Sequence, residues 1–264
     1  MATIKDAKVL VVAPTIQRSG ESKSLTFSRP LRISKSSNFD EYDSILAFSA
    51  DGTPADATVI GRHLCQREFG KGPDLVVSGI NSGDNSSVHA LLTSGTCAAA
   101  FEGALENIPS IAFSMVVRAS ELFYGGKVQS DYSVAAKKSK HIVEIVLNDS
   151  LPEDIKFLNV NYPAEVKLDT PIRVVDLAIK KYSTEVLEAT DPRKTPIYWI
   201  WGEQLPNIPE NTDSKAIIDN QISITPISLG FGRWSRPIID HYFRSKNIQI
   251  VDPKENSFLA EKKD

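Results

Sequence analysis

A polar run over residues 78–96, SGINSGDNSSVHALLTSGT, holds the side chains of this sequence that are best suited to chemistry. Near its start Asn81 follows an apolar segment and a glycine turn, where its amide oxygen could bind a hard divalent cation. The same side chain could instead bond the nearby backbone and close a local turn. At its end, Ser94, Gly95 and Thr96 lead into CAAAFEGALEN, a run typical of a helix. The free N–H groups there could bind a phosphate, or Ser94 could simply cap the helix.

Strands and helices must alternate over residues 8–160 to position this run. Short apolar, β-branched segments are typical of strands that are buried on both faces of a parallel sheet. Between them, Thr53 and Pro54 indicate the start of a helix that ends near Gly70, and residues 130–147 carry apolar side chains at helical spacing. This pattern predicts an α/β fold with a mostly parallel sheet, which binds its ligand at the carboxyl ends of the strands. The predicted strands are residues 9–13, 45–48, 75–77, 110–113 and 157–160.

The character of the sequence changes after residue 162. Stretches rich in Pro, Asn and Asp separate three further predicted strands, residues 173–177, 197–201 and 222–225, and no long helix is indicated. We expect an antiparallel appendage of hairpins that serves assembly or frames the site. The tail, residues 233–264, could be a short helix against a partner subunit or a solvated end. Residues 1–162 are thus the expected core, and residues 163–264 the appendage and tail of the same structural unit.

The overall composition narrows the classes of function. The 264 residues carry a formal net charge of −3, which argues against a general binder of nucleic acid or of membrane surfaces. No apolar run approaches the roughly 18 residues of a membrane-spanning helix. Cys65 and Cys97 are too few for a disulfide framework, so we expect a cytoplasmic protein with reduced thiols. Glycine-rich nucleotide motifs and zinc-ligand spacings do not occur, which leaves nicotinamide, P-loop and zinc proteins unsupported.

Six segments, taken in order along the chain, carry a resemblance to a known family. They are VVAPTIQRSGESKSLT (residues 11–26), GTPAD (52–56), PDLVVSGINSGDN (73–85), SGTCAAAFEGALENIPSIAFS (94–114), DPRKTPIYW (191–199) and TDSKAIIDNQISITP (212–226). Together they resemble the SurE family, the survival-protein-E type nucleotidases. The resemblance spans nearly the whole chain, and several matching blocks in one order are far more specific than any single block.

This resemblance implies a Rossmann-like core with helices on both faces of the sheet and a C-terminal hairpin appendage used in dimerisation, so a homodimer or homotetramer is expected. It also implies a metal-dependent phosphatase, a 5′/3′-nucleotidase that hydrolyses nucleoside monophosphates with one divalent cation, Mg²⁺ or Mn²⁺. By motif position the expected metal ligands are Ser19 and Asn81. The phosphate is expected between that cation and the helix start. The expected phosphate-binding residues are Asn85, Ser94, Gly95 and Thr96.

The chain departs from the family pattern at its beginning. The family opens with a central apolar strand that ends in Asn-Asp-Asp-Gly, and no Asp-Asp pair occurs in this sequence. We therefore expect Met1 to be an internal methionine of the natural product. We also expect the strand over residues 9–13 to lack its inner neighbour in the sheet. Without the Asp-Asp pair, the sequence assigns no catalytic residue. Neutral oxygens alone hold Mg²⁺ poorly, so we expect impaired activity. The alternative is a degenerate relative that binds nucleotide or phosphate without turnover.

Overall fold

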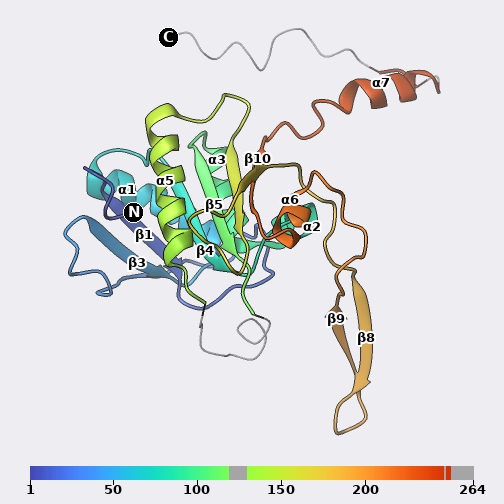
Figure 1. Cartoon of the computed structure of the whole chain (residues 1–264), viewed down its shortest axis with the longest axis horizontal. Helices are drawn as coiled ribbons and strands as arrows, with labels where there is room; N and C mark the ends of the chain where they lie inside the picture. The colour runs from blue at the N-terminus through green and yellow to red at the C-terminus, as the bar shows by residue number, and fades with distance from the viewer. Residues whose placement is uncertain (119–129, 247, 251–264) are drawn as a thin grey trace. The chain divides into compact units, whose positions relative to one another are not determined.

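Strands and helices alternate between residues 45 and 162, as Figure 1 shows. The computed structural model describes residues 1–118, 130–246 and 248–250. The chain divides into two compact units, Met1–Ile227 and Ser228–Asp264. The described strands are β1 (Val9–Pro14), β2 (Ile33–Lys35), β3 (Ile45–Ala50), β4 (Val76–Ser82), β5 (Ser110–Met115), β6 (Phe157–Tyr162), β7 (Ile172–Val174), β8 (Glu185–Thr190), β9 (Pro196–Trp201) and β10 (Ile222–Ile227). The described helices are α1 (Pro54–Phe69), α2 (Val88–Thr93), α3 (Gly95–Leu105), α5 (Ser133–Asp149), α6 (Asp213–Ile218) and α7 (Arg236–Arg244).

The larger sheet has five strands in the order β4-β5-β6-β10-β7. The strands β4, β5 and β6 run parallel, β10 runs antiparallel to β6, and β7 runs parallel to β10. Every residue of β5 is buried, because α3 covers one face of the strand and α5 covers the other. The predicted α/β class, with a mostly parallel sheet and helices on both faces, is confirmed.

The smaller sheet has three strands in the order β1-β3-β2. The strands β1 and β3 are parallel, whereas β2 is antiparallel to β3. Among the described strands, none pairs with the second edge of β1 or with the edge of β4 that faces away from β5. The two sheets are therefore separate, and they share a helix layer because α1 packs on β1, α3 packs on β4, and the two helices pack on each other. No residue of β1 is consequently fully buried, and Ala13 is exposed, as expected for a strand with a neighbour on one side.

Local sequence explains where α1 begins and ends. The Thr53 hydroxyl accepts the N–H of Asp56 at 3.1 Å, and the Asp56 carboxylate accepts the N–H of Thr53 at 2.9 Å, which is a reciprocal capping box. Pro54 suits the first turn because its missing N–H needs no partner there. Gly70 ends the helix with φ of 76°, a left-handed conformation that glycine adopts without strain. The helix predicted over residues 53–70 is confirmed.

The main apolar core lies between the five-stranded sheet and α5. Apolar side chains of α5 pack on those of β5, β6 and β10 that point to the same face of the sheet. The predicted helix over residues 130–147 is present, and it extends over Ser133–Asp149. The buried members of this core are Ile111, Phe113, Met115, Val117, Ala135, Ile142, Val143, Val146, Val160, Tyr162 and Ile222.

The residues after 162 divide between the core sheet and a hairpin. The strands β7 and β10 join the five-stranded sheet, so these parts of the expected appendage belong to the core. The strands β8 and β9 form the predicted antiparallel hairpin, and all of their residues are exposed. In the second unit, α7 is a short helix, one of the two alternatives for the tail, and its contact with a partner subunit stays a prediction. Residues 251–264 lie outside the described residues. That residues 163–264 serve oligomerisation stays a prediction.

Candidate active site

Asn81 stands near the end of β4, where the strand shifts its register against β5. Gly79 precedes it with φ of 103°, and a Cβ atom there would lie 2.1 Å from the carbonyl oxygen of Phe113, so only glycine fits. The Asn81 amide nitrogen donates to the carbonyl oxygen of Gly83 at 2.7 Å and closes a local turn. Its Oδ1 has no hydrogen-bond donor among the described residues. The turn and an oxygen that can bind a cation are therefore compatible.

Asn85 points into the protein. Its side chain is buried, and its amide nitrogen donates to the Ser114 hydroxyl at 2.7 Å. Its backbone N–H donates to Asn161 Oδ1 at 2.7 Å, and its carbonyl oxygen accepts from Asn159 Nδ2 at 2.9 Å. These three hydrogen bonds fix both the backbone and the side chain of Asn85. Its contact with phosphate stays a prediction.

The start of α3 combines a cap with a close helix contact. Ser94 is the N-cap, because its hydroxyl accepts the N–H of Cys97 at 3.1 Å. A Cβ atom on Gly95 would lie 2.7 Å from Pro54 Cγ, which places the first turns of α3 and α1 side by side. Thr96 is half-buried, and its hydroxyl has no partner among the described residues. The capping role of Ser94 is thus present and occupies the Cys97 N–H, which leaves the N–H groups of Gly95 and Thr96 for an anion.

Cys97 behaves as a packed residue of α3. Its side chain is fully buried, and burial raises the pKa of its thiol to about 12. The thiol donates to Asn159 Oδ1 at 3.7 Å. Because a nucleophilic cysteine requires a thiolate, this group is not a nucleophile at neutral pH.

The loop over residues 15–26, which contains Ser19, is fastened to both helix starts. Toward α3, the Ser22 N–H donates to the carbonyl oxygen of Thr93 at 3.1 Å, just before the Ser94 cap. Toward α1, the Thr53 hydroxyl donates to the carbonyl oxygen of Ser24 at 2.7 Å. Ser19 itself is exposed on this loop. Its neighbour Arg18 places a carbonyl oxygen 3.4 Å from a Cβ atom on Gly95.

Asp56 anchors the same loop to α1. Its carboxylate accepts the Thr26 N–H at 2.9 Å and the Thr26 hydroxyl at 2.6 Å, besides the N–H of Thr53. Burial of Asp56 acts to raise its pKa, but the hydrogen bonds outweigh it and hold the pKa of the carboxyl below 3.8. Asp56 is therefore ionised at neutral pH and engaged with protein donors.

The described residues do not by themselves form a site for a divalent cation. They contain no cluster of three or more His, Cys, Asp or Glu side chains that could hold a metal ion. Ser19 and Asn81, the expected ligands, offer neutral oxygens only, whereas Mg²⁺ is bound in proteins through one or two carboxylates. Within the described part of the chain, no hydrogen bond joins these two side chains. Their role as ligands stays a prediction, and these two neutral oxygens alone would hold the cation weakly.

Sequence reasoning missed a buried charged group beside the loop after β4. Lys181 Nζ lies 2.8 Å from Asp84 Oδ2, and both side chains are largely buried. Asp213 at the start of α6 accepts the N–H groups of Ser87 and Ala178 at 2.7 and 2.9 Å. Burial raises the pKa of the Asp213 carboxyl, and its backbone hydrogen bonds act against that rise. No local pattern could have indicated these contacts, because each joins residues far apart along the chain.

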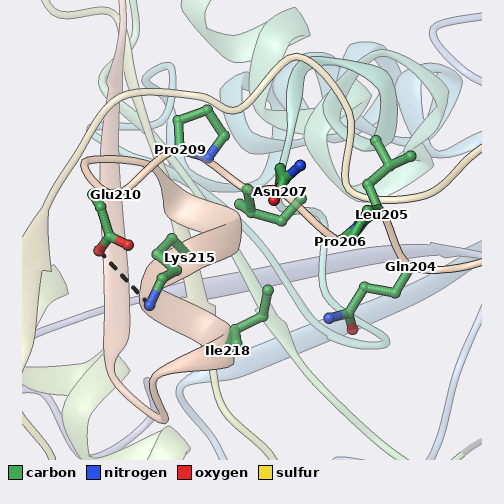
Figure 2. A pocket seen from close by; sticks show the side chains of 9 residues that line it. Gln204, Leu205, Pro206, Asn207, Pro209, Glu210, Lys215 and Ile218 are labelled. Carbon is green, nitrogen blue, oxygen red and sulfur yellow. Dashed lines mark ion pairs between the residues drawn. The ribbon is translucent and has the colours of Figure 1, made fainter.

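A surface hollow of about 410 Å³ lies beside α6, and Figure 2 shows it from close by. The segment over residues 204–210 and one side of α6 line it, and Lys215 pairs with Glu210 at 3.7 Å. None of the predicted metal or phosphate residues lines this hollow. We therefore place the candidate site at the starts of α1 and α3.

Comparisons with known proteins identify relatives of this chain. A curated relative from Methanocella arvoryzae, "5′-nucleotidase SurE", is 38% identical over 224 residues, which cover 84% of this chain and 82% of the relative. A relative of the same name from Archaeoglobus fulgidus is 40% identical over 222 residues, covering 84% and 81%. Among solved structures, "Crystal Structure of Sure Protein from Aquifex aeolicus" aligns with a TM-score of 0.70 at 34% identity and covers 89% of this chain and 88% of that one.

A sequence model of a whole protein family also matches this chain. The sequence model described as "Survival protein SurE" matches residues 1–184, which include the loop over residues 15–26, Asn81 and the start of α3. The family model and the solved structure thus agree on the family and on the fold. This chain belongs to the SurE family.

Proposed function

We propose that this chain releases phosphate from nucleoside monophosphates at the starts of α1 and α3, with the loop over residues 15–26 and Asn81 supplying further side chains. It is a phosphoric monoester hydrolase of the 5′-nucleotidase kind. The observation that carries the location is the contact of Gly95 with Pro54, which brings two helix N-termini together. Free N–H groups and the helix dipole favour a phosphate there.

The side chains divide between two tasks in this proposal. The phosphate is bound by N–H groups of Ser94, Gly95 and Thr96 and by the Thr96 hydroxyl. These donors stabilise the negative charge on the phosphoryl oxygens. Asn85 completes the phosphate-binding set at the sheet side. Asn81 would hold a divalent cation through its Oδ1, and Ser19 would hold it through its hydroxyl. The SurE nucleotidases are metal-dependent, and we propose Mg²⁺ or Mn²⁺ because both ligands are oxygens.

A second candidate function follows from the donor set. With only neutral oxygens at Ser19 and Asn81, the described residues could bind a nucleoside monophosphate at the helix starts without hydrolysing it. Calorimetric titration with adenosine monophosphate separates the two functions. Binding that is equal with and without Mn²⁺, together with no phosphate release, is the result of the second function.

Phosphate release tests the leading function. We expect the chain to release phosphate from adenosine monophosphate with Mn²⁺ or Mg²⁺ and to stop when EDTA is added. Asn81→Ala should raise the Mn²⁺ concentration needed for half-maximal activity by about tenfold or more, in line with lost metal contacts. Asn148→Ala, an exposed position on α5, is the matched control. Equal Mn²⁺ dependence of the two variants would exclude Asn81 as a ligand.

The hairpin of β8 and β9 supports a proposal about assembly. It exposes a row of large apolar side chains, which in a free monomer would face water: Val186, Leu187, Ile197, Tyr198, Trp199, Ile200 and Trp201. We propose that two copies of the chain cover these side chains in a homodimer or a homotetramer. Ile200 is 82% exposed, so Ile200→Lys should dissociate the oligomer in size-exclusion chromatography with light scattering. An unchanged mass would refute this role of the hairpin.

We also propose that the protein acts in the cytoplasm and has no nucleic-acid or membrane partner. Both cysteines are free and buried, which suits a reducing compartment. Among the described residues, no helix combines the length and the apolar character needed to cross a membrane.

A further inference from the structure

The two faces of the five-stranded sheet differ in chemistry. Where β5, β6 and β10 face α5, their side chains are apolar. On the opposite face, toward α3 and α6, the same strands carry buried polar side chains. Side chains alternate along a strand, and the register pairs Asn161 with Ser114 on one side and with Ser223 on the other, so these three form a row. The buried polar layer, as we name this set, consists of Ser114, Asn159, Asn161, Ser223 and Thr225.

The buried polar layer holds one residue of the loop after β4 at three points. Asn161 accepts the backbone N–H of Asn85, Asn159 donates to its carbonyl oxygen, and Ser114 accepts from its side chain. The distances of these bonds are 2.7, 2.9 and 2.7 Å. A backbone group held on both sides by side chains of one strand has little freedom to turn.

The neighbours of Asn85 are held as well. The N–H of Ser87 donates to Asp213 at 2.7 Å, and the Ser214 hydroxyl donates to that of Ser86 at 3.3 Å. Asn159 also accepts from the Cys97 thiol in the first turn of α3. One side chain of β6 thus contacts both the loop and the helix start that we propose to bind phosphate.

Burial of polar groups carries a cost that apolar side chains at these positions would not incur. Three polar atoms of the layer have no hydrogen-bond partner in the described residues: Asn161 Nδ2, Ser223 Oγ and Thr225 Oγ1. The bonds that are formed all converge on the loop and α3, whereas the unpartnered hydroxyls lie on β10. The arrangement favours orientation of the loop over stability of the sheet.

We propose that Asn161 is a positioning residue that, with Asn159, fixes residues 84–87 and so sets the distance between Asn81 and the start of α3. It acts through the Asn85 backbone and touches neither substrate nor cation. The functional part of this inference rests on the proposed use of Asn81 and of Ser94, Gly95 and Thr96. The fixing of residues 84–87 by Asn161 and Asn159 does not depend on that proposed use.

Amide hydrogen exchange of the substrate-free chain tests the fixing of the loop. Asn161→Ala removes the acceptor of the Asn85 N–H, and we expect exchange over residues 84–88 to become at least tenfold faster. Ser223→Ala is the matched control, since Ser223 is fully buried, lies opposite Asn161 on the same face and makes no bond to the loop. Asn161→Asp retains the acceptor oxygen and should restore slow exchange. Equal exchange in Asn161→Ala and Ser223→Ala would overturn the inference.

Kinetics then test the consequence for the reaction. In Asn161→Ala we expect kcat for adenosine monophosphate to fall about tenfold, KM to change less than threefold, and Asn161→Asp to recover most of kcat. Faster loop exchange with unchanged kcat would overturn the link to the reaction. Should the wild-type chain release no phosphate, the proposed function fails, and the exchange result still decides whether Asn161 positions the loop.

Discussion

Replacing Asp56 by alanine should destabilise the fold by about 3 kcal/mol. The carboxylate accepts three hydrogen bonds, two from Thr26 and one from Thr53, at 2.6 to 2.9 Å. Bonds to a charged group contribute about 1.5 kcal/mol each at the lower end of their range, which gives about 4.5 kcal/mol for three. Relief from burying the carboxylate offsets about 1.5 kcal/mol. The melting temperature should fall by about 6 to 12 °C for a chain of this size.

Urea unfolding at pH 7, followed by circular dichroism, measures this loss. Thr26→Val is the graded control, because it removes only the 2.6 Å hydroxyl bond to Asp56 and should cost about 1.5 kcal/mol. Asp56→Ala with a loss below about 1 kcal/mol, or no greater than that of Thr26→Val, would refute the view that the carboxylate holds both the α1 cap and the loop.

The pH dependence of stability gives a second readout of the same contacts. Hydrogen bonds outweigh burial and hold the pKa of Asp56 below 3.8 in the folded chain, so its contribution is complete above pH 3.8. The contribution disappears as the pH falls below 3.8 and through the lowered folded pKa. Wild type and Asp56→Ala should therefore differ fully at pH 5 to 7 and converge below pH 3.8. A difference that does not shrink in acid would contradict the assignment.

Two further substitutions address packing and buried charge. Gly95→Ala places a Cβ atom 2.7 Å from Pro54 Cγ and should cost about 1 to 3 kcal/mol by thermal melting, whereas Gly72→Ala, which meets nothing within 4 Å, should be close to neutral. Equal effects would show that the helix contact is not tight. Lys181→Met leaves the Asp84 carboxylate without its cation and should cost about 3 kcal/mol, most of which the double variant Asp84→Asn/Lys181→Met should recover in urea unfolding.

Local patterns predicted much of the fold because the signals lie within short stretches of sequence. The Thr53, Pro54 and Gly70 signals indicated α1 within one residue at each end. The apolar run ending at Pro14 predicted β1. By contrast, nothing local indicated that β10 adds antiparallel to β6, since pairing depends on segments about sixty residues apart.

In the candidate site, too, some features could be predicted from neighbouring residues and others could not. The glycine at position 79 and the helix signal after Ser94 were readable from neighbouring residues. The buried pair of Asp84 and Lys181, and the clamp of Asn85 by Asn161, join distant parts of the chain and only the folded structure brings them together. Metal ligation by Ser19 and Asn81 rested on the family pattern, and the described residues supply no charged donor to complete it.

The separation of the two sheets has a consequence for how the molecule unfolds. Because no described strand links β1 to β4, cooperativity between the sheets passes through the contact of α1 with α3 and through the ties of the loop over residues 15–26. Regions that share no strand pairing can open as separate units, so we expect β1, β3 and β2 with α1 to behave as a foldon of their own. Native-state hydrogen exchange should then show this foldon opening at lower free energy than the five-stranded sheet. The starts of α1 and α3 would separate in that opening. The candidate site therefore lies at the boundary between two parts of the molecule that can unfold independently.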